Sequence, residues 1–279
     1  MHNILYGFFD YKEYLDYEHW SDFLKAPHLI LSSCAILFII LFCIFFRKID
    51  HKKIDIFLKI LSILVLINES TKIIWESYYD LKPEFRGEFN YEGLLPLYTC
   101  SMFIYCLIIA AWTKGKAKEC ALGFLTTLSI FAGLTNFLYL QILDGYPLWS
   151  YAALTSFFFH FFMVFTGIFL VSTGYYRPHI KDSLKAYIPV ILFSIIVMPV
   201  NFILKFKGYH PNYMMYMDGI NLPILENIEV FFTSRHLTLI YSFLVMGGYY
   251  LITIMVIGIY NLIDFIKAKC KQIKNKELN

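Results

Sequence analysis

Apolar positions gather into runs of about 20 residues that are separated by short polar segments. Such runs are typical of helices that cross a bilayer, whereas the strands of a membrane barrel would alternate apolar and polar positions. The pattern therefore predicts an all-α, polytopic membrane protein built as a bundle of about seven transmembrane helices. The expected spans are residues 27–46, 54–78, 94–112, 120–142, 151–173, 184–206 and 237–264.

Composition agrees with this pattern, because 58% of the 279 residues are hydrophobic and only 16% are charged. An ordinary soluble domain is far richer in charge. Residues 1–26 are aromatic and acidic, with no apolar core, so we expect an extracytoplasmic or interfacial segment rather than a signal peptide. Residues 27–264 form the predicted membrane domain, and residues 265–279 form a basic cytoplasmic tail.

Lys and Arg residues divide unevenly between the two predicted faces. Fifteen fall in the segments 47–53, 114–118 and 177–185 and in the tail, whereas seven fall in the segments of the opposite face. Because cytoplasmic loops carry the excess of basic residues, the N-terminus is expected outside and the C-terminus in the cytoplasm. The basic residues form no single patch and the net charge is only +3, so nucleic acid is not an expected partner.

Polar side chains inside the spans gather at one depth. Counting about 1.5 Å per residue from the outer end of each span puts these groups roughly 8–13 Å deep. Such groups are costly in a bilayer, so they usually face the bundle interior and often mark a functional site. The set comprises Glu69, Cys100, Asn136, His160 and Asn201, with His28 at the outer mouth of the first span.

Each of these residues also has a purely structural interpretation. His160 lies within a run of phenylalanines and could simply hydrogen-bond a neighbouring helix. Glu69 is followed by Lys72 and Glu76 at spacings of three and four residues, which is typical of an ion-pair ladder along one helix. Asn136 and Asn201 fit helix packing at least as well as chemistry.

Taken together, the same groups favour nucleophilic chemistry. A cysteine nucleophile needs a base, because the thiolate is the attacking form. His160 is expected near the depth of Cys100, and Glu69, Asn136 or Asn201 could orient its imidazole. At that depth the accessible substrate is a membrane lipid or its acyl chain, so acyl transfer or ester hydrolysis is the predicted reaction.

No cofactor or metal is predicted, because GxGxxG, Walker and HExxH motifs are missing from the sequence. The six cysteines do not fall in the loops expected outside, so no disulfide framework is predicted either.

The chain resembles the YwaF-like bacterial integral membrane proteins and, more distantly, the animal transmembrane phospholipid acyltransferases. The resemblance rests on Pro27-His28-Leu29, on Asn68-Glu69 with Trp75, on LPLYTC ending at Cys100, on His160, and on Tyr175-Tyr-Arg-Pro178, Asn201 and Asn212-Tyr213. It implies a seven-helix bundle in a bacterial plasma membrane, with Cys100 as the acyl-accepting residue and His160 as its partner.

Two alternatives remain open at this stage. In the first, Thr99 replaces Cys100 as nucleophile, as in the Thr–His pair of animal membrane fatty-ester hydrolases. In the second, the protein is not an enzyme, and Glu69, Lys72 and the asparagines line a pocket that binds or transports a small molecule or lipid. The missing inverted repeat weighs against a transporter.

Overall fold

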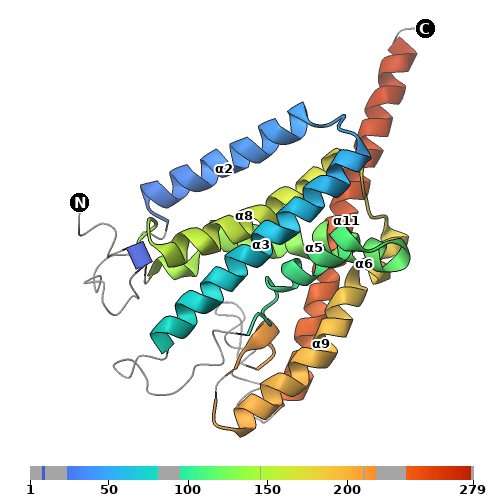
Figure 1. Cartoon of the computed structure of the whole chain (residues 1–279). Coiled ribbons are helices and arrows are strands. Elements are labelled where there is room, and N and C mark those ends of the chain that lie inside the picture. The colour runs from blue at the N-terminus through green and yellow to red at the C-terminus, as the bar shows by residue number, and fades with distance from the viewer. Residues whose placement is uncertain are drawn as a thin grey trace.

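A computed structural model of the chain describes residues 8–9, 24–80, 95–144, 146–209, 211–217 and 237–277, and the regular structure within these ranges is helical (Figure 1). Five stretches are long and apolar enough to cross a membrane: Ala26–Phe45, Gly115–Leu138, Tyr151–Ser172, Ile180–Phe206 and Thr238–Ile273. The prediction of an all-helical protein with several membrane-spanning helices is therefore confirmed.

The helices follow the predicted spans closely at some places and depart from them at others. The first, fifth and sixth spans agree with helices to within one residue at either end. In chain order the α-helices are α2 (Ala26–Phe45), α3 (His51–Asp80), α5 (Met102–Trp112), α6 (Gly115–Leu125), α7 (Leu128–Leu138), α8 (Tyr151–Ser172), α9 (Ser183–Phe206) and α11 (Thr238–Glu277).

Helices α3 and α11 are both longer than the spans predicted for them. Helix α3 has 30 residues, but its charged side chains set it apart from the five apolar stretches, so the crossing at 54–78 stays a prediction. Helix α11 has 40 residues and continues through the predicted basic tail. Ala, Lys and Gln in that tail favour a helix, and no Gly or Pro ends it before residue 277.

The third span begins later than predicted, which corrects the position of Cys100. Leu94 lies outside the described residues, and α5 starts only at Met102, so Cys100 precedes the helix instead of lying two turns inside it. Pro96 disfavours helical geometry at the residue before it. The backbone instead turns sharply, with the Leu97 amide donating to the Leu95 carbonyl (2.7 Å) and the Tyr105 hydroxyl to the Pro96 carbonyl (3.2 Å).

The predicted fourth span is divided into α6 and α7 at Thr126 and Thr127. Both threonine hydroxyls donate to carbonyls of the preceding turn, with Thr127 Oγ1 2.7 Å from the Gly123 oxygen. Such bonds bend helices, because they compete with the backbone ladder. The Tyr260 hydroxyl of α11 donates to the Thr126 carbonyl (2.8 Å), which satisfies a polar group at the break.

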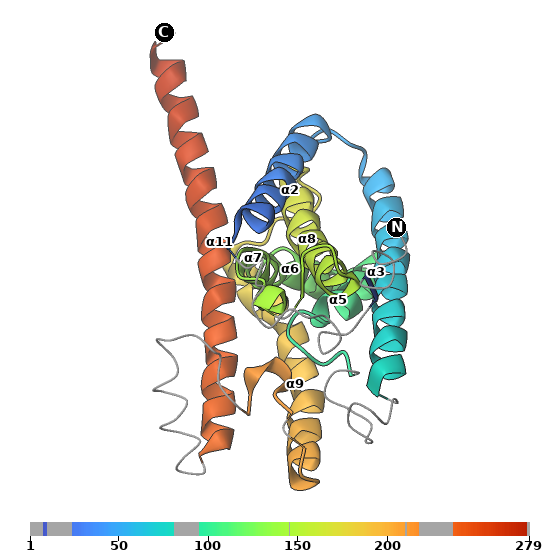
Figure 2. The same ribbon diagram turned by 90° about the vertical axis from the view of Figure 1, so that its left-hand side faces the viewer.

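Close packing fixes α8 against its neighbours. At Gly133 of α7 an added Cβ would lie 2.8 Å from the Met163 Cβ of α8, so only glycine allows this approach. Gly133 therefore lies at a packed interface between α7 and α8. On another side of α8, aromatic rings from α2, α3 and α8 interlock; they are Phe42, Phe57, Phe165 and Phe169. Helices α2, α3 and α8 thus share one cluster of aromatic rings, and Figures 1 and 2 show how these helices are arranged.

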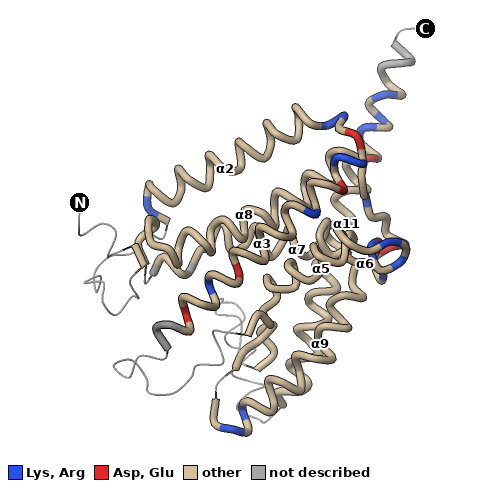
Figure 3. The backbone as a smooth tube through the Cα atoms, viewed as in Figure 1, with Lys and Arg blue, Asp and Glu red and all other residues tan. Residues whose placement is uncertain are grey.

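Basic segments from four parts of the chain lie toward one end of the bundle, around the start of α3 and the start of α6 (Figure 3). Ion pairs connect them there: Lys118 Nζ to Asp55 Oδ1 (2.6 Å), Arg177 Nε to Asp264 Oδ2 (2.7 Å) and Lys185 Nζ to Glu119 Oε2 (3.2 Å). We call this region the basic end. Its grouping fits the predicted asymmetry of the loops, and its assignment to the cytoplasm stays a prediction.

Candidate functional site

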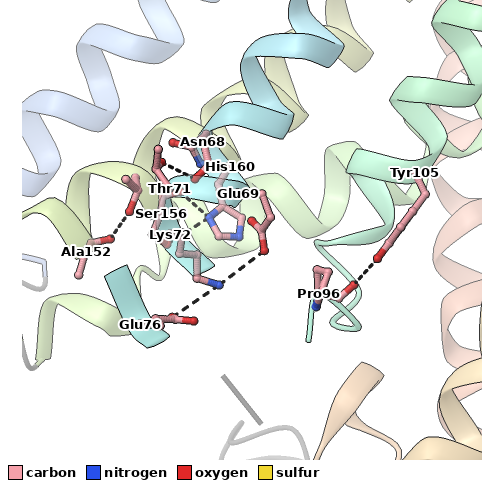
Figure 4. A network of polar contacts seen from close by, with 11 residues as sticks. Asn68, Glu69, Thr71, Lys72, Glu76, Pro96, Tyr105, Ala152, Ser156 and His160 are labelled. Atoms are coloured by element: carbon pink, nitrogen blue, oxygen red, sulfur yellow. Dashed lines mark hydrogen bonds and ion pairs between the residues drawn. The ribbon is translucent and has the colours of Figure 1, made fainter. Parts of the chain in front are cut away.

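A cavity of about 300 Å³ lies between α3, the segment that leads into α5, and the N-terminal half of α8. Glu69, Cys100 and His160 all line it, so three of the predicted site residues come together. The remaining lining residues are Asn68, Lys72, Trp75, Glu76, Tyr98, Ser101, Ile142, Tyr146, Ala152, Thr155, Ser156 and Phe159. Figure 4 shows the polar contacts around α3 and α8 at this place.

Helix α3 contributes the charges of the cavity. Glu69, Lys72 and Glu76 are spaced by three and four residues, so they share one face of the helix. Lys72 Nζ lies 3.9 Å from Glu69 Oε1 and 3.7 Å from Glu76 Oε1, and the Glu69 side chain is 11% exposed. The predicted ladder is therefore confirmed, but its contacts are long and it faces a cavity. A ligand can compete for these charges more easily than for a tightly bonded pair.

His160 is held in one orientation by its own helix. Its Nδ1 lies 2.8 Å from the carbonyl oxygen of Ser156, one turn earlier in α8. A carbonyl only accepts, so Nδ1 carries the proton and Nε2 carries the lone pair when the ring is neutral. The side chain is buried, with 7% of the residue exposed, and Nε2 has no hydrogen-bond partner in the described part of the chain. The ring thus presents a proton acceptor that its neighbours leave free.

Cys100 occupies the turn immediately before α5 and is a free, half-buried thiol. Its carbonyl accepts from the Phe103 amide (2.9 Å), which starts the hydrogen-bond ladder of the helix. Cys100 therefore directly precedes the N-terminus of α5, the positive end of the helix dipole, where negative charge is favoured. Irregular backbone of this kind is tolerated at membrane depth where it lines a cavity, as this segment does.

Thr99 has a different environment from its neighbour. Its Oγ1 lies 2.8 Å from the Tyr249 hydroxyl of α11, and that hydroxyl donates to the Met214 carbonyl (2.9 Å). Since the single phenolic proton goes to Met214, Thr99 donates its own proton to the Tyr249 oxygen. Thr99 is also not among the residues that line the cavity. The Thr99 hydroxyl therefore has a structural role, because it bonds Tyr249 of α11.

The other predicted pocket residues lie elsewhere. His28 donates through Nε2 to the Phe137 carbonyl (3.1 Å), and its Nδ1 accepts from the Leu24 amide (3.3 Å). Asn136 donates to the Ala132 carbonyl of its own helix (3.1 Å). Neither His28 nor Asn136 lines the cavity. The polar layer inferred from depth therefore divides into residues that line the cavity and residues that make helix contacts elsewhere.

Asn201 belongs to a buried loop contact. Its Nδ2 donates to the Tyr213 carbonyl (3.0 Å), and its Oδ1 accepts from the Tyr213 amide (3.1 Å). Tyr213 and Met214 are fully buried, and Met214 adopts a positive φ of 55°. Asn201 therefore fixes the loop that also receives the Tyr249 hydrogen bond. It supports the segment before α5 from outside the cavity, through the Tyr213–Tyr98 ring contact with centroids 5.2 Å apart.

Several lining residues were not predicted. The sequence patterns assign no role to Tyr98, Tyr146 or Ser156, and Trp75 enters only through the family resemblance. Ser156 could have been found as the residue one turn before His160, but Tyr146 belongs to a connection with no periodic pattern. Within the described residues, no group of three or more His, Cys, Asp and Glu side chains could hold a metal ion.

Comparison with known proteins places the chain in a family. No curated protein gave a significant match, and no solved structure did. One family model, described as the TMEM164 family, matches residues 23–260, a range that contains α2 and the whole cavity lining. Because this match covers most of the chain, the protein is a multi-pass membrane protein of the TMEM164 family.

Proposed function

We propose that the protein is an intramembrane lipid acyltransferase or lipid ester hydrolase, with Cys100 as nucleophile and His160 as general base. The observation that carries the proposal is the shared cavity, in which the thiol-bearing turn meets a histidine whose Nε2 has no partner among the described residues. A neutral imidazole with its free lone pair in a cavity is the form that removes a proton.

The reaction would proceed in two halves. His160 Nε2 takes the Cys100 proton while the sulfur attacks the carbonyl carbon of an acyl ester. The carbon–oxygen bond then breaks, and the departing alcohol takes the proton from the imidazolium, leaving a thioester. In the second half an acceptor hydroxyl gives its proton to His160 and attacks the thioester. The carbon–sulfur bond breaks, and the sulfur recovers the proton. A lipid acceptor gives transfer, and water gives hydrolysis.

The surroundings favour a lipid as the substrate. The cavity lies in a protein with five apolar spanning stretches, so membrane lipids are the molecules present at high concentration around it. Aromatic rings of Trp75, Tyr98 and Tyr146 line it together with the charges of α3. We place this cavity in the outer half of a bacterial plasma membrane, as the basic loops and the YwaF-like resemblance predict.

The test compares Cys100→Ala with Thr99→Ala in the full-length protein. After incubation with acyl lipid, wild type is expected to carry a hydroxylamine-sensitive acyl group, Thr99→Ala is expected to retain it, and Cys100→Ala is expected to lose it. Acylation that survives Cys100→Ala would refute the proposal. Labelling by a serine- and threonine-reactive fluorophosphonate probe that is lost in Thr99→Ala would transfer the role to Thr99.

The same cavity supports a second candidate, a non-enzymatic protein that binds or transports a small molecule or lipid. The observation that favours it is the loose contact of Lys72 with two carboxylates at 3.7–3.9 Å, which leaves room for a charged ligand group. Ligand binding or flux that tolerates Cys100→Ser but is lost in Glu69→Gln would support this candidate over the enzyme.

A further inference from the structure

The last part of α11 extends beyond the bundle (Figures 1 and 2). Among the side chains that the structure describes, the last attachment of α11 to the bundle is at Asp264, which pairs with Arg177 Nε at 2.7 Å. Arg177 Nη2 also donates to the Tyr260 carbonyl at 3.1 Å. From Phe265 to Ile273 every side chain is exposed. We call residues 265–277 the helical extension. It lies outside the residues 23–260 that match the family model.

The helical extension is amphipathic. Ile266, Cys270 and Ile273 recur at spacings of four and three residues, so they form one apolar stripe, which Leu262 continues toward the bundle. At about 100° per residue, Lys267 and Lys271 lie on one side of this stripe and Lys269 on the other. Phe265, Ile266 and Ile273 are 65%, 50% and 50% exposed. An apolar stripe with lysines on both sides is typical of helices that lie at a membrane surface.

The charge of the helical extension favours one occupant for this stripe. The sequence of the extension has five lysines between 267 and 276 against one acidic residue, Glu277, and Asp264 is already paired with Arg177. A second copy would place lysines from both helices beside the shared seam, which is unfavourable. Anionic lipid headgroups, in contrast, attract a basic segment next to a membrane-spanning helix.

Helix α11 is long enough for the helical extension to lie beyond the hydrocarbon core of the bilayer. Forty residues make a helix of about 60 Å, against a hydrocarbon core of about 30 Å. The part that crosses the bilayer therefore accounts for only about half of the helix. The extension emerges at the basic end, where the connection between α2 and α3 also carries Arg47 and Lys48 (Figure 3).

We propose that the helical extension docks on anionic lipid headgroups at the membrane surface of the basic end. Lys267, Lys269 and Lys271 contact the headgroups, and Ile266, Cys270 and Ile273 face the acyl boundary. This surface is independent of the cavity and of the acyl-transfer proposal.

Cys270 provides a native reporter, because it lies within the apolar stripe and is exposed. The full-length protein, with Cys34, Cys100 and Cys120 changed to serine, is labelled at Cys270 with an environment-sensitive maleimide dye. It is then placed in nanodiscs of phosphatidylcholine, with or without 30 mol% phosphatidylserine (about a third anionic lipid, a strongly charged surface). The same background with Cys270→Ser measures labelling elsewhere.

The expected result is a blue-shifted emission in the anionic nanodiscs only, which is weakened at high salt because exposed charges are screened. Changing Lys267, Lys269 and Lys271 to glutamine should abolish the shift. The matched control changes Lys205 and Lys207, two exposed lysines at the far end of α9, and should preserve it. Identical emission in both nanodiscs would overturn the proposal. So would a Cys270–Cys270 cross-link formed regardless of lipid composition, since it would identify a second copy as the occupant.

Discussion

Charged groups make short hydrogen bonds and ion pairs at the basic end, whereas around the cavity their contacts are longer. At the basic end Asp55 receives Lys118 Nζ at 2.6 Å and the Tyr175 hydroxyl at 2.5 Å, and Arg177 reaches both Asp264 and the Tyr260 carbonyl. Around the cavity Lys72 lies 3.7–3.9 Å from its carboxylates, and His160 Nε2 has no partner within the described ranges.

This difference separates a structural role from a functional one. Short, multiple hydrogen bonds fix groups in place, so the network at the basic end joins α3, α6, α11 and the connection after α8. A buried polar atom without a partner costs free energy, so such an atom in the wall of a cavity is a candidate for a bond to a ligand or substrate. Substitutions should therefore affect stability at the basic end and activity at the cavity.

The largest effect is expected for His160→Gln. Glutamine preserves much of the volume and hydrogen bonding but removes the basic nitrogen, so acyl transfer should fall by about 10²–10⁴-fold, the usual contribution of a general base. The measurement is the rate of acyl transfer to a lipid acceptor in detergent–lipid micelles, together with the thermal midpoint.

His28→Gln is the matched control for that change, because His28 is also a buried histidine but uses both ring nitrogens for packing bonds. It should lower the thermal midpoint while preserving the rate per folded molecule. Equal loss of rate in the two variants would show that His160 has only a structural role.

An intermediate effect is expected for Asn201→Ala. The change removes the side-chain partner of the buried Tyr213 amide and one partner of the Tyr213 carbonyl, which also accepts from the Tyr216 amide (3.4 Å). Loss of these bonds should cost about 1–3 kcal/mol in total. The thermal midpoint in detergent should fall accordingly. Because Tyr213 contacts Tyr98 of the cavity lining, the rate should also fall, but by less than in His160→Gln.

The comparison variant for Asn201 is Asn136→Ala. Asn136 bonds only the Ala132 carbonyl of its own helix in the described structure, so its loss should change stability by less than about 0.5 kcal/mol. If the two alanine variants lost the same stability, the two hydrogen bonds between Asn201 and Tyr213 would not stabilise the fold as expected.

A smaller effect than that of Asn201→Ala is expected for Tyr175→Phe at the basic end. Loss of the hydroxyl bond to Asp55 should cost about 1 kcal/mol and leave the acyl-transfer rate unchanged. Burial and this hydrogen bond raise the pKa of the Tyr175 phenol above its usual value of 10.0. Its contribution is therefore complete below pH 10 and is lost as the pH rises through the raised pKa.

The check on this prediction is a series of thermal midpoints between pH 8 and pH 11. The gap between wild type and Tyr175→Phe should narrow as the pH increases. A difference in thermal midpoint that stays constant with pH would mean that the pKa of the phenol does not change on unfolding. A lower acyl-transfer rate of Tyr175→Phe at pH 8 would show that the basic end also affects the reaction in the cavity.

The sequence predicted the helices well where hydrophobicity alone decides them. The first, fifth and sixth spans were correct to within one residue, because each is an uninterrupted apolar run with a clear polar boundary. It failed at α5 and at the α6–α7 break. There Pro96 and the pair Thr126–Thr127 redirect hydrogen bonds, and an apolar run does not reveal which hydrogen bonds a polar side chain will form.

For the candidate site, depth counting brought together Glu69, Cys100 and His160 but also included His28, Asn136 and Asn201. Depth fixes one coordinate along the membrane normal and says nothing about the direction in which a side chain points around its helix. The structure supplies that direction, and it assigns the first three residues to the cavity and the others to helix and loop contacts.

The sequence by itself therefore determined that this chain is a helical membrane protein, because the free energy of apolar burial depends on composition within each run. It also determined which rare polar groups lie in that apolar setting. Only the tertiary structure decided which of them face one another. That choice depends on helix rotation and on the break before α5, which turns Cys100 toward the cavity and Thr99 toward Tyr249.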